Sequence, residues 1–523
     1  MDASQGQPTP PETRLHALLH SNVPGASSDF PAVESAISEI DVELAPLKQD
    51  ILELQTRLST LEFKRDELMS RRDQHRAIVS ALRRMPPETL GEIFMWTLPS
   101  VADIWETPDV FGIKATPWVL THVCSRWRQI AVEMPALWSL VMILYTDYNF
   151  PLAAVELQVQ RAKNLRIHVY GSHRREPGPQ VEVLTYLIEH SARWEELSIG
   201  LTREMNLILP TVQDRLPLLR RLCLEWDEED GAEETALNVD CFQSATSLVD
   251  LRICRRWQPI SYSAPANQLT RYTADAPWET HRAILSVSPG LIQAHISAFP
   301  VLPDPEPNPE VIQLSQLQCL YVSHVDLLQY FKVPVLEQVT LRVTSDELDI
   351  TPALHRFIVD TASTVRRLGL RGLPDTGLAS QILARYTSIT ELAILIFGGD
   401  GYQYTEHEFS IPNALISLLD IPPVSEGSPV VIAPKLTHVH IAFEDLLPVN
   451  ADIFVRMLET RSQLPGGALR AVTVTMEQDP QLPAYILEKL NGLRERSGFE
   501  FSLVVDTNIF HHVAPWTCNP TWN

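Results

Sequence analysis

The chain has 523 residues, of which 45% are apolar and 20% charged, a composition that excludes wholesale disorder and leaves room for several domains. Its 65 acidic and 42 basic residues give a formal net charge of −23, and this excess of acid argues against sequence-independent binding to nucleic-acid phosphates. The 40 prolines against 20 glycines indicate many proline-bounded connections between elements.

Targeting and cofactor signals are absent from the sequence pattern. The N-terminus, MDASQGQPTPPETRLH, has no basic region followed by an apolar run, which a secretory signal needs. The longest apolar run, near residues 137–145, is far shorter than the ~20 residues that span a bilayer. The six cysteines form no CxxC pair and no zinc spacing. We therefore expect reduced cysteines, no metal or other cofactor, no membrane or nucleic-acid partner, and a cytoplasmic or nuclear location.

A heptad pattern follows a leader, residues 1–32, whose Pro, Ser, Gln and Gly content predicts disorder. Residues 33–82 repeat apolar side chains at a and d positions, which predicts a coiled-coil helix. Pro46 would remove a hydrogen bond inside this helix, so we expect the main helix to begin there. The apolar a and d residues are Ile37, Ile40, Leu44, Leu47, Ile51, Leu54, Leu58, Leu61, Leu68, Val79 and Leu82.

Charge is uneven along the heptad segment. Residues 33–63 carry seven acids and two bases, whereas residues 64–84 carry three acids and seven bases. Antiparallel self-pairing would match these opposite halves. The same distribution would also complement the dipole of a single helix, so both interpretations stay open.

Residues 83–141 form a tryptophan-rich segment with two expected helices. In residues 85–94, MPPETLGEIF, two prolines precede Glu88, and Leu90, Ile93 and Phe94 then share one helical face. A second helix, about residues 118–131, would place Val123 and Trp127 on one face. Leu137 and Trp138 would then close a compact three-helix domain.

This segment resembles an F-box. The family pattern reads Leu-Pro-x-Glu-x-Leu-x-x-Ile-Phe, then Val-Cys-(Arg/Lys)-x-Trp-(Arg/Lys), then Leu-Trp. The chain has MPPETLGEIF at 85–94, VCSRWR at 123–128 and Leu137-Trp138. It departs from the pattern in Met85, a volume-conserving change, and in an insertion that makes the gap between Phe94 and Val123, 28 residues, longer than usual. The whole arrangement is similar to fungal F-box-like proteins.

The resemblance implies a docking function without chemistry. F-box domains bind a Skp-family adaptor, which a cullin–RING scaffold holds, and they present a client protein to the ubiquitin-conjugating enzyme. The residues that carry over as adaptor contacts, each of which could instead be a core residue, are Pro86, Leu90, Ile93, Val123, Cys124 and Trp127. The expected core of the F-box consists of Met85, Phe94, Leu137 and Trp138.

Residues 150–505 repeat one unit: an apolar residue, two variable residues, an apolar residue, one variable residue and an apolar residue. Leu219/Leu222/Leu224 and Leu336/Val339/Leu341 are examples, and Leu269/Tyr272/Ala274 is a degenerate copy. The mean interval of about 27 residues lies in the leucine-rich-repeat range, and the last apolar pair alternates as a short strand does. The fold class predicted is therefore α/β: a coiled-coil helix, a three-helix F-box and a leucine-rich-repeat-like solenoid. An ordinary α/β domain with similar strands is the alternative.

Motifs for catalysis are missing. The sequence contains no phosphate-binding glycine loop, no GxSxG and no HExxH. His511 and His512 are adjacent and predict a surface pair, and the acidic run at 225–234 predicts a solvated loop or a contact for a cation or basic partner. We therefore expect no enzyme activity and no catalytic residues.

The sequence favours the substrate-recognition subunit of a Skp–cullin–F-box ubiquitin ligase, with an unidentified protein client. A non-ligase interaction scaffold that uses the coiled coil and repeats is the alternative, and a hydrolase hidden in 150–505 is a third hypothesis. Residues beside the expected strands are candidate client contacts, and residues 506–523 are expected to form a C-terminal tail. The candidate contacts are Thr340, Arg342, His438 and His440. Residues 146–523 carry a net charge of −17, which favours a basic client.

Overall fold

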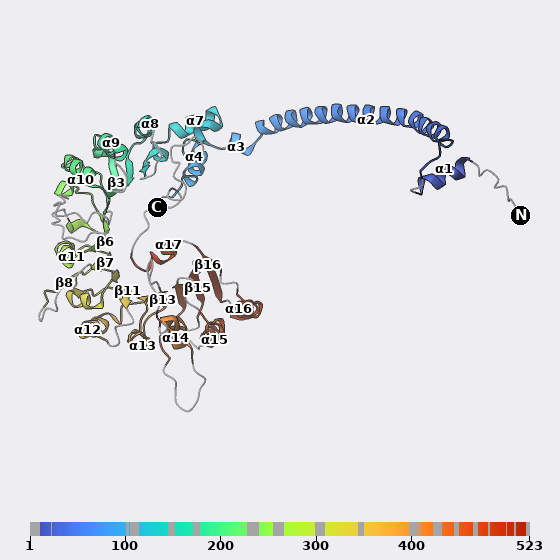
Figure 1. Cartoon of the computed structure of the whole chain (residues 1–523). Helices are drawn as coiled ribbons and strands as arrows, with labels where there is room; N and C mark the ends of the chain where they lie inside the picture. Colours follow the sequence, from blue (N-terminus) through green and yellow to red (C-terminus); the bar gives the residue numbers. More distant parts are fainter. Residues whose placement is uncertain are drawn as a thin grey trace. The chain divides into compact units, whose positions relative to one another are not determined.

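The chain is a mixed α/β protein with one long N-terminal helix and one large, open parallel sheet (Figure 1). It divides into two compact units, Met1–Leu90 and Gly91–Asn523. The computed structural model describes residues 11–21, 24–100, 104, 115–144, 152–170, 178–226, 240–254, 266–298, 309–343, 350–396, 405, 408–421, 431–443, 449–463, 469–479, 482–497, 499–506 and 509–518. Within these ranges, no helix combines the length and the apolar character that a membrane crossing requires.

The N-terminal unit begins with α1 (Pro11–Leu19) and continues into α2 (Phe30–Ile78) and α3 (Ala81–Arg84). The Nε and Nη2 atoms of Arg14 donate to the two carboxylate oxygens of Asp29 at 2.6 and 3.0 Å. The structure therefore differs from the disordered leader expected for residues 1–32, because α1 and this ion pair lie inside it.

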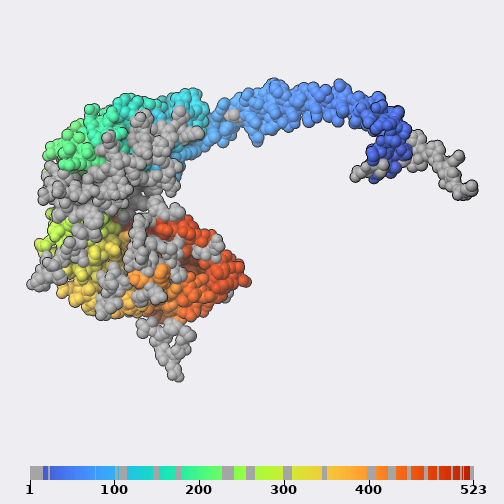
Figure 2. Space-filling view, in the orientation of Figure 1, coloured from blue at the N-terminus to red at the C-terminus, as the bar shows by residue number. Residues whose placement is uncertain are grey.

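Helix α2 has 49 residues, which gives it a length of about 73 Å at 1.5 Å per residue. Pro46 lies inside the helix, so the expectation that the helix begins there was wrong. A proline inside a helix removes one hydrogen bond and crowds the preceding turn, but the helix continues through Pro46. The apolar a and d side chains from Ile37 to Leu68 are exposed along this helix, which Figure 2 shows in blue as a continuous rod. Val79 and Leu82, which follow its end, are also exposed.

The tryptophan-rich segment contains α4 (Pro87–Trp96), α6 (Leu120–Val123), α7 (Ser125–Val132) and the 3-10 helix η1 (Pro135–Trp138). The sequence predicted one helix over about 118–131, and this was wrong. Cys124 adopts an extended backbone, with φ −160° and ψ 168°, which ends α6 and provides the N-cap of α7. Val123 and Trp127 therefore lie on two different helices.

The parallel sheet contains fourteen strands among the described residues, and their order in space follows their order in the chain. Each pairing in this sheet is parallel, so the chain crosses back over the sheet between successive strands. The strands are β1 (Leu140–Ile143), β2 (Leu165–Tyr170), β3 (Trp194–Leu201), β4 (Arg221–Trp226), β5 (Asp250–Cys254), β6 (Arg271–Ala276), β7 (Gln293–Ala298), β9 (Cys319–Val322), β11 (Gln338–Val343), β12 (Arg367–Gly372), β13 (Glu391–Ile396), β14 (His438–Phe443), β15 (Ala471–Met476) and β16 (Glu500–Val505). A separate pair consists of β8 (Ile312–Gln313) and β10 (Phe331–Lys332).

The sequence units coincide with strands of this sheet. In each copy the second and third apolar residues lie within one strand and are buried, as Leu222 and Leu224 are in β4. Strands β1, β2 and β16 extend the sheet beyond the copies that the sequence reading identified. β13 pairs directly with β14, and β14 with β15, so helices and connections account for the two long sequence intervals.

Helices cover one face of the sheet, and α17 (Phe510–Val513) lies on the opposite face (Figure 1). We call this opposite face the inner face. The helices on the other side are α8 (Leu152–Arg161), α9 (Gly178–Ile188), α10 (Arg203–Ile208), α11 (Trp278–Leu285), α12 (Pro352–Thr361), α13 (Thr376–Arg385), α14 (Ile411–Leu419), α15 (Ala451–Ser462) and α16 (Ala484–Ser497). Short 3-10 turns η2 (Ser191–Arg193), η3 (Leu209–Val212), η4 (Asp240–Phe242), η5 (Ala266–Gln268), η6 (Val325–Tyr330) and η7 (Glu408–Ser410) occur in the connections.

Candidate interaction surfaces

Residues 83–141, whose sequence resembles an F-box and which we call the F-box-like segment, contain a cluster of buried aromatic side chains. Pro87 and Glu88 begin α4, where a proline needs no hydrogen-bond partner and an acid complements the helix dipole. Leu90 and Phe94 are both completely buried. The Phe94 ring lies 4.8 Å from the ring of Trp127, centroid to centroid, so this contact joins α4 to α7.

Leu137 and Trp138 close the segment and pack near α8, the first helix that covers the sheet. Trp138 is completely buried, and its Nε1 donates to the carbonyl oxygen of Ala131 at 2.7 Å. Trp118 packs edge-on to Trp138 at 5.0 Å, and the Arg161 guanidinium of α8 lies 4.3 Å from the Trp138 centroid. The aromatic cluster therefore continues directly into the sheet unit, whose first strand follows at Leu140.

The expected adaptor contacts differ in exposure. Leu90 is completely buried, and Trp127 is partly buried against Phe94. Ile93 and Val123 keep 39% and 55% of their surface exposed, so neither belongs to the buried core of the segment. The exposed members of the expected set are Pro86, Ile93, Val123 and Cys124. Of the expected core residues, Phe94, Leu137 and Trp138 are buried and Met85 is intermediate.

The insertion between Phe94 and Val123 contributes one described side chain to the sheet. Ile104 is 2% exposed. It packs with Met142 on β1, with Leu144 directly after β1, and with Tyr170 on β2. Residues 101–103 and 105–114 of this segment lie outside the described residues.

A ladder of alternating charge crosses the inner face at its N-terminal strands. Arg166, Glu196, Arg221, Asp250 and Arg271 are successive register partners from β2 to β6. Opposite charges directly across neighbouring strands stabilise a sheet. The ladder therefore helps to hold these strands in register.

Glu196 is the most buried member of the ladder. Its side chain is fully covered and bonds His168 Nε2 at 2.6 Å and Arg166 Nε at 3.2 Å, and it also pairs with Arg221. Burial by itself would raise the pKa of this carboxyl, but the hydrogen bond from His168 and the charges of His168, Arg166 and Arg221 outweigh burial and lower the pKa. Glu196 is therefore ionised at neutral pH.

The sequence reading missed this ladder, although a signal for it was present. In each unit the ladder residue stands directly before the middle apolar residue, as Arg221 does before Leu222 and Asp250 before Leu251. Aligning the units on that apolar residue would have shown the alternation of sign. Parallel strands in register bring equivalent positions of neighbouring units side by side.

The C-terminal segment covers the middle of the inner face. We call residues 509–518 the strap. Three apolar side chains of the strap pack against β13 and β14. Ile509, Val513 and Trp516 form one buried cluster with Ala393 and Leu395 of β13 and Ala442 of β14. The Trp516 ring lies 4.5 Å from the guanidinium carbon of Arg367 on β12. The strap therefore occupies part of the surface on which the sequence placed client contacts.

The four candidate client contacts fall into two groups. Thr340 is completely buried and donates from Oγ1 to the carbonyl oxygen of Trp516 at 2.6 Å. His440 lies 6.1 Å from the Trp516 ring, and burial lowers its pKa to about 4. Arg342 and His438 are exposed. The strap therefore covers two of the candidates and leaves the other two accessible.

The remaining expected features are only partly described. His512 Nε2 lies 2.8 Å from Asp506 Oδ2, so this histidine has a carboxylate neighbour that the sequence reading did not identify. The side chain of His511 and most of the acidic run at 225–234 lie outside the described residues. All six cysteines are free.

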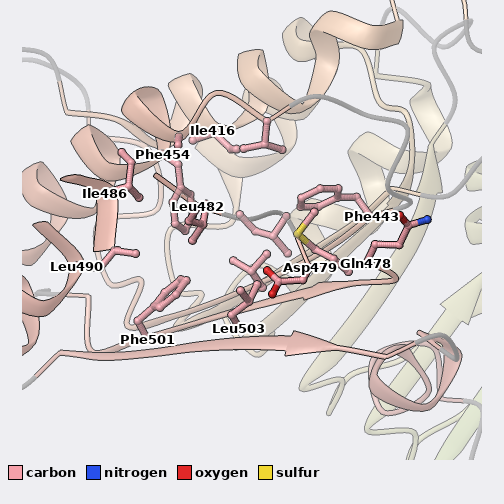
Figure 3. A pocket seen from close by; sticks show the side chains of 15 residues that line it. Ile416, Phe443, Phe454, Gln478, Asp479, Leu482, Ile486, Leu490, Phe501 and Leu503 are labelled. Carbon is pink, nitrogen blue, oxygen red and sulfur yellow. The ribbon is translucent and has the colours of Figure 1, made fainter. Parts of the chain in front are cut away.

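A cavity of about 330 Å³ lies between α14–α16 and the last three strands (Figure 3). Apolar side chains such as Phe454, Ile486 and Phe501 line it, and its polar lining side chains are Gln478 and Asp479. These lining residues include no histidine, cysteine or serine that could act as a nucleophile or base beside Asp479. In the part of the chain that the structure describes, no group of three or more His, Cys, Asp or Glu side chains is placed to hold a metal ion.

Comparison with known proteins returned no match: no protein-family model, no curated protein and no solved structure is significantly similar to this chain.

Proposed function

We propose that this protein is the substrate-recognition subunit of a Skp–cullin–F-box ubiquitin ligase. Residues 83–141 would dock a Skp-family adaptor, and residues 150–505, a leucine-rich-repeat-like solenoid, would bind a client protein. The chain itself would supply no chemistry. It would raise the local concentration of the client near the ubiquitin-conjugating enzyme, which is catalysis by proximity.

The observation that carries this proposal is the exposure of Ile93 and Val123. Both belong to the F-box-like pattern, and both keep a large apolar surface in solvent while Phe94 and Trp138 of the same segment are fully buried. Exposed apolar side chains beside a closed core favour a protein-binding surface. They also lie in the pattern at positions that contact the adaptor in the family.

The inner face of the sheet supports the client-binding part of the proposal. A strand from every unit contributes side chains to this face, and stacked units of this kind present extended binding surfaces. Arg342 and His438 are exposed there. The acidic balance of residues 146–523 favours a client with a basic surface.

The decisive experiment compares adaptor co-purification by the wild type, Ile93→Asp and Val123→Asp. A carboxylate buried in an apolar interface loses hydration without a partner, so we expect each variant to weaken adaptor binding at least tenfold. Leu207→Asp is the matched control, because Leu207 on α10 is a leucine with 73% exposure outside the motif. Undiminished adaptor binding by both motif variants, with normal thermal unfolding, would refute the docking assignment.

Leu90→Ala is unsuitable for this test because Leu90 is completely buried. Truncating a buried leucine costs about 2–5 kcal/mol of stability, so lost binding would report unfolding as readily as a lost contact. The surface variants avoid this ambiguity.

A non-ligase scaffold is the second candidate function, and the exposed apolar seam of α2 favours it. Cullin capture separates the two functions. A ligase subunit retains cullin through the adaptor, whereas a scaffold retains the adaptor or a second copy of the chain without cullin.

A further inference from the structure

The strap is held on the inner face through its own backbone. His295 Nδ1 on β7 donates to the carbonyl of Thr517 at 2.5 Å. Gln338 Nε2 on β11 donates to the carbonyls of Pro515 and Trp516, each at 2.9 Å. Consecutive carbonyls of residues 515–517 are thus bound by two strands that flank β9 in the sheet.

This crossing places Cys518 beside Cys319, the first residue of β9. Cys319 is the register partner of Gln338 on β11 and of Gln293 on β7, so it lies between the strands that hold the strap. The thiols of Cys319 and Cys518 are near enough for each to shift the pKa of the other. Cys518 has φ 54° and is 6% exposed, so the fold holds it in a backbone conformation that residues other than glycine rarely adopt.

The two thiols have different environments. The interaction with Cys518 lowers the pKa of Cys319 and outweighs the opposing effect of burial, and the positive charge of Arg367 lowers this pKa further. The same interaction, together with burial, raises the pKa of Cys518. Cys319 is also the more accessible thiol. It is therefore the better nucleophile, because the thiolate is the reactive form.

We propose that Cys319 and Cys518 form a redox latch in which a hydroperoxide joins them in a disulfide that fixes the strap to the inner face. The Cys319 thiolate attacks one peroxide oxygen, the O–O bond breaks, and the leaving oxygen departs as water or alcohol after protonation. The sulfenic acid on Cys319 is then attacked by Cys518 sulfur. The S–O bond breaks, water leaves with the Cys518 proton, and the S–S bond forms.

With hydrogen peroxide, two thiols lose two electrons and one peroxide yields two waters. A small thiol such as glutathione reverses the latch by thiol–disulfide exchange. Fixing the strap would keep Thr340 and the surface around Trp516 covered. The effect on client binding rests on the proposed function, whereas formation of the disulfide does not.

A second thiol pair provides an internal comparison. Cys223 on β4 and Cys254 on β5 also shift each other's pKa. The interaction with Cys223 lowers the pKa of Cys254 to about 7 despite burial, and Arg252, whose Nε lies 3.1 Å from the sulfur, lowers it further. A disulfide there would join strands that already pair. It would leave the strap free.

The test treats the reduced full-length chain with graded hydrogen peroxide and maps disulfides by non-reducing peptide mass spectrometry. We expect a peptide pair joined through Cys319 and Cys518 with a loss of two hydrogens. We also expect amide hydrogen exchange in residues 509–518 to slow about tenfold. Cys518→Ser should abolish both effects, and Cys254→Ser, the matched control, should preserve them.

The outcomes are distinguishable. Oxidation of exposed Cys124 without a Cys319–Cys518 link would overturn the latch, as would a Cys223–Cys254 link alone. A Cys319–Cys518 link with unchanged exchange in residues 509–518 would overturn its action on the strap. Cys319→Ser gives a second variant if Cys518→Ser does not fold, and it should also prevent the link. None of these readouts involves the adaptor, so failure of the latch and failure of the proposed function are separate results.

Discussion

Truncating Trp516 to alanine is expected to release the strap from the inner face. The Trp516 side chain is 7% exposed and packs against Ala393, Leu395 and Ala442 of the sheet. Its ring also lies beneath the Arg367 guanidinium at 4.5 Å. Alanine would lose both contacts. It would keep the carbonyl that Thr340 and Gln338 bind, so the variant separates the side chain's contribution from that of the backbone.

The magnitude follows from this burial. A tryptophan buries roughly 150–250 Å², which corresponds to about 4–6 kcal/mol at 25 cal/mol per Å². A partly desolvated cation–π contact adds about 1 kcal/mol, while small side chains in the cluster limit the loss by partial collapse. Replacing a buried tryptophan by alanine typically lowers the free energy of unfolding by about 3–5 kcal/mol. We expect the free energy of strap opening to fall by that amount.

Hydrogen exchange measures this opening directly. The amides of Trp516 and Thr517 donate to the Val513 carbonyl at 2.9 and 3.2 Å, and both bonds break when the strap detaches and unwinds. A loss of 3 kcal/mol corresponds to roughly 100-fold faster exchange. Trp96→Ala is the matched control, because Trp96 is 88% exposed. Equal exchange of residues 509–518 in the wild type and Trp516→Ala would refute the packing argument.

Two further predictions concern the charge ladder and the long helix. Because the pKa of Glu196 is lower in the folded protein than its ordinary 4.5, its contribution to stability is present above about pH 4.5 and is lost as the pH falls through the folded value. Glu196→Gln should therefore lower the free energy of unfolding by about 1–3 kcal/mol at pH 7. It should also reduce the loss of stability that the wild type shows below pH 4.5. Urea unfolding at several pH values from 3.5 to 7 measures both effects. A steep acid loss retained by the variant would contradict this. Residues 33–82, isolated as a peptide, should self-associate at high micromolar concentration, because apolar side chains along α2 are exposed; sedimentation as a monomer would exclude it.

Local periodicity explains why so much of the sheet was predictable. Alternating apolar residues such as Leu222 and Leu224 produce a strand with one buried face whatever lies far away in the chain. The break at Cys124 and the passage of α2 through Pro46 were not predictable, because each depends on a small energy difference that neighbouring turns decide.

The candidate sites show the same division. The F-box-like pattern predicts candidate contact and core residues within 85–138. It could not separate Ile93, which is exposed, from Leu90, which is buried, because the spacing of the two residues places both on the same apolar face of α4. Candidate client contacts were chosen as variable strand positions, and the sequence could not show that the strap covers Thr340.

The sequence by itself determined that a long N-terminal helix, a helical segment rich in aromatic residues and a series of similar strands exist, because each follows from interactions between residues close together in the chain. Tertiary structure alone decided what lies on the inner face. The charge ladder around Glu196 exists because parallel register aligns equivalent positions of successive units. The strap meets Cys319 and Gln338 across about 180–200 residues of chain, and no local pattern encodes a contact that depends on the completed sheet.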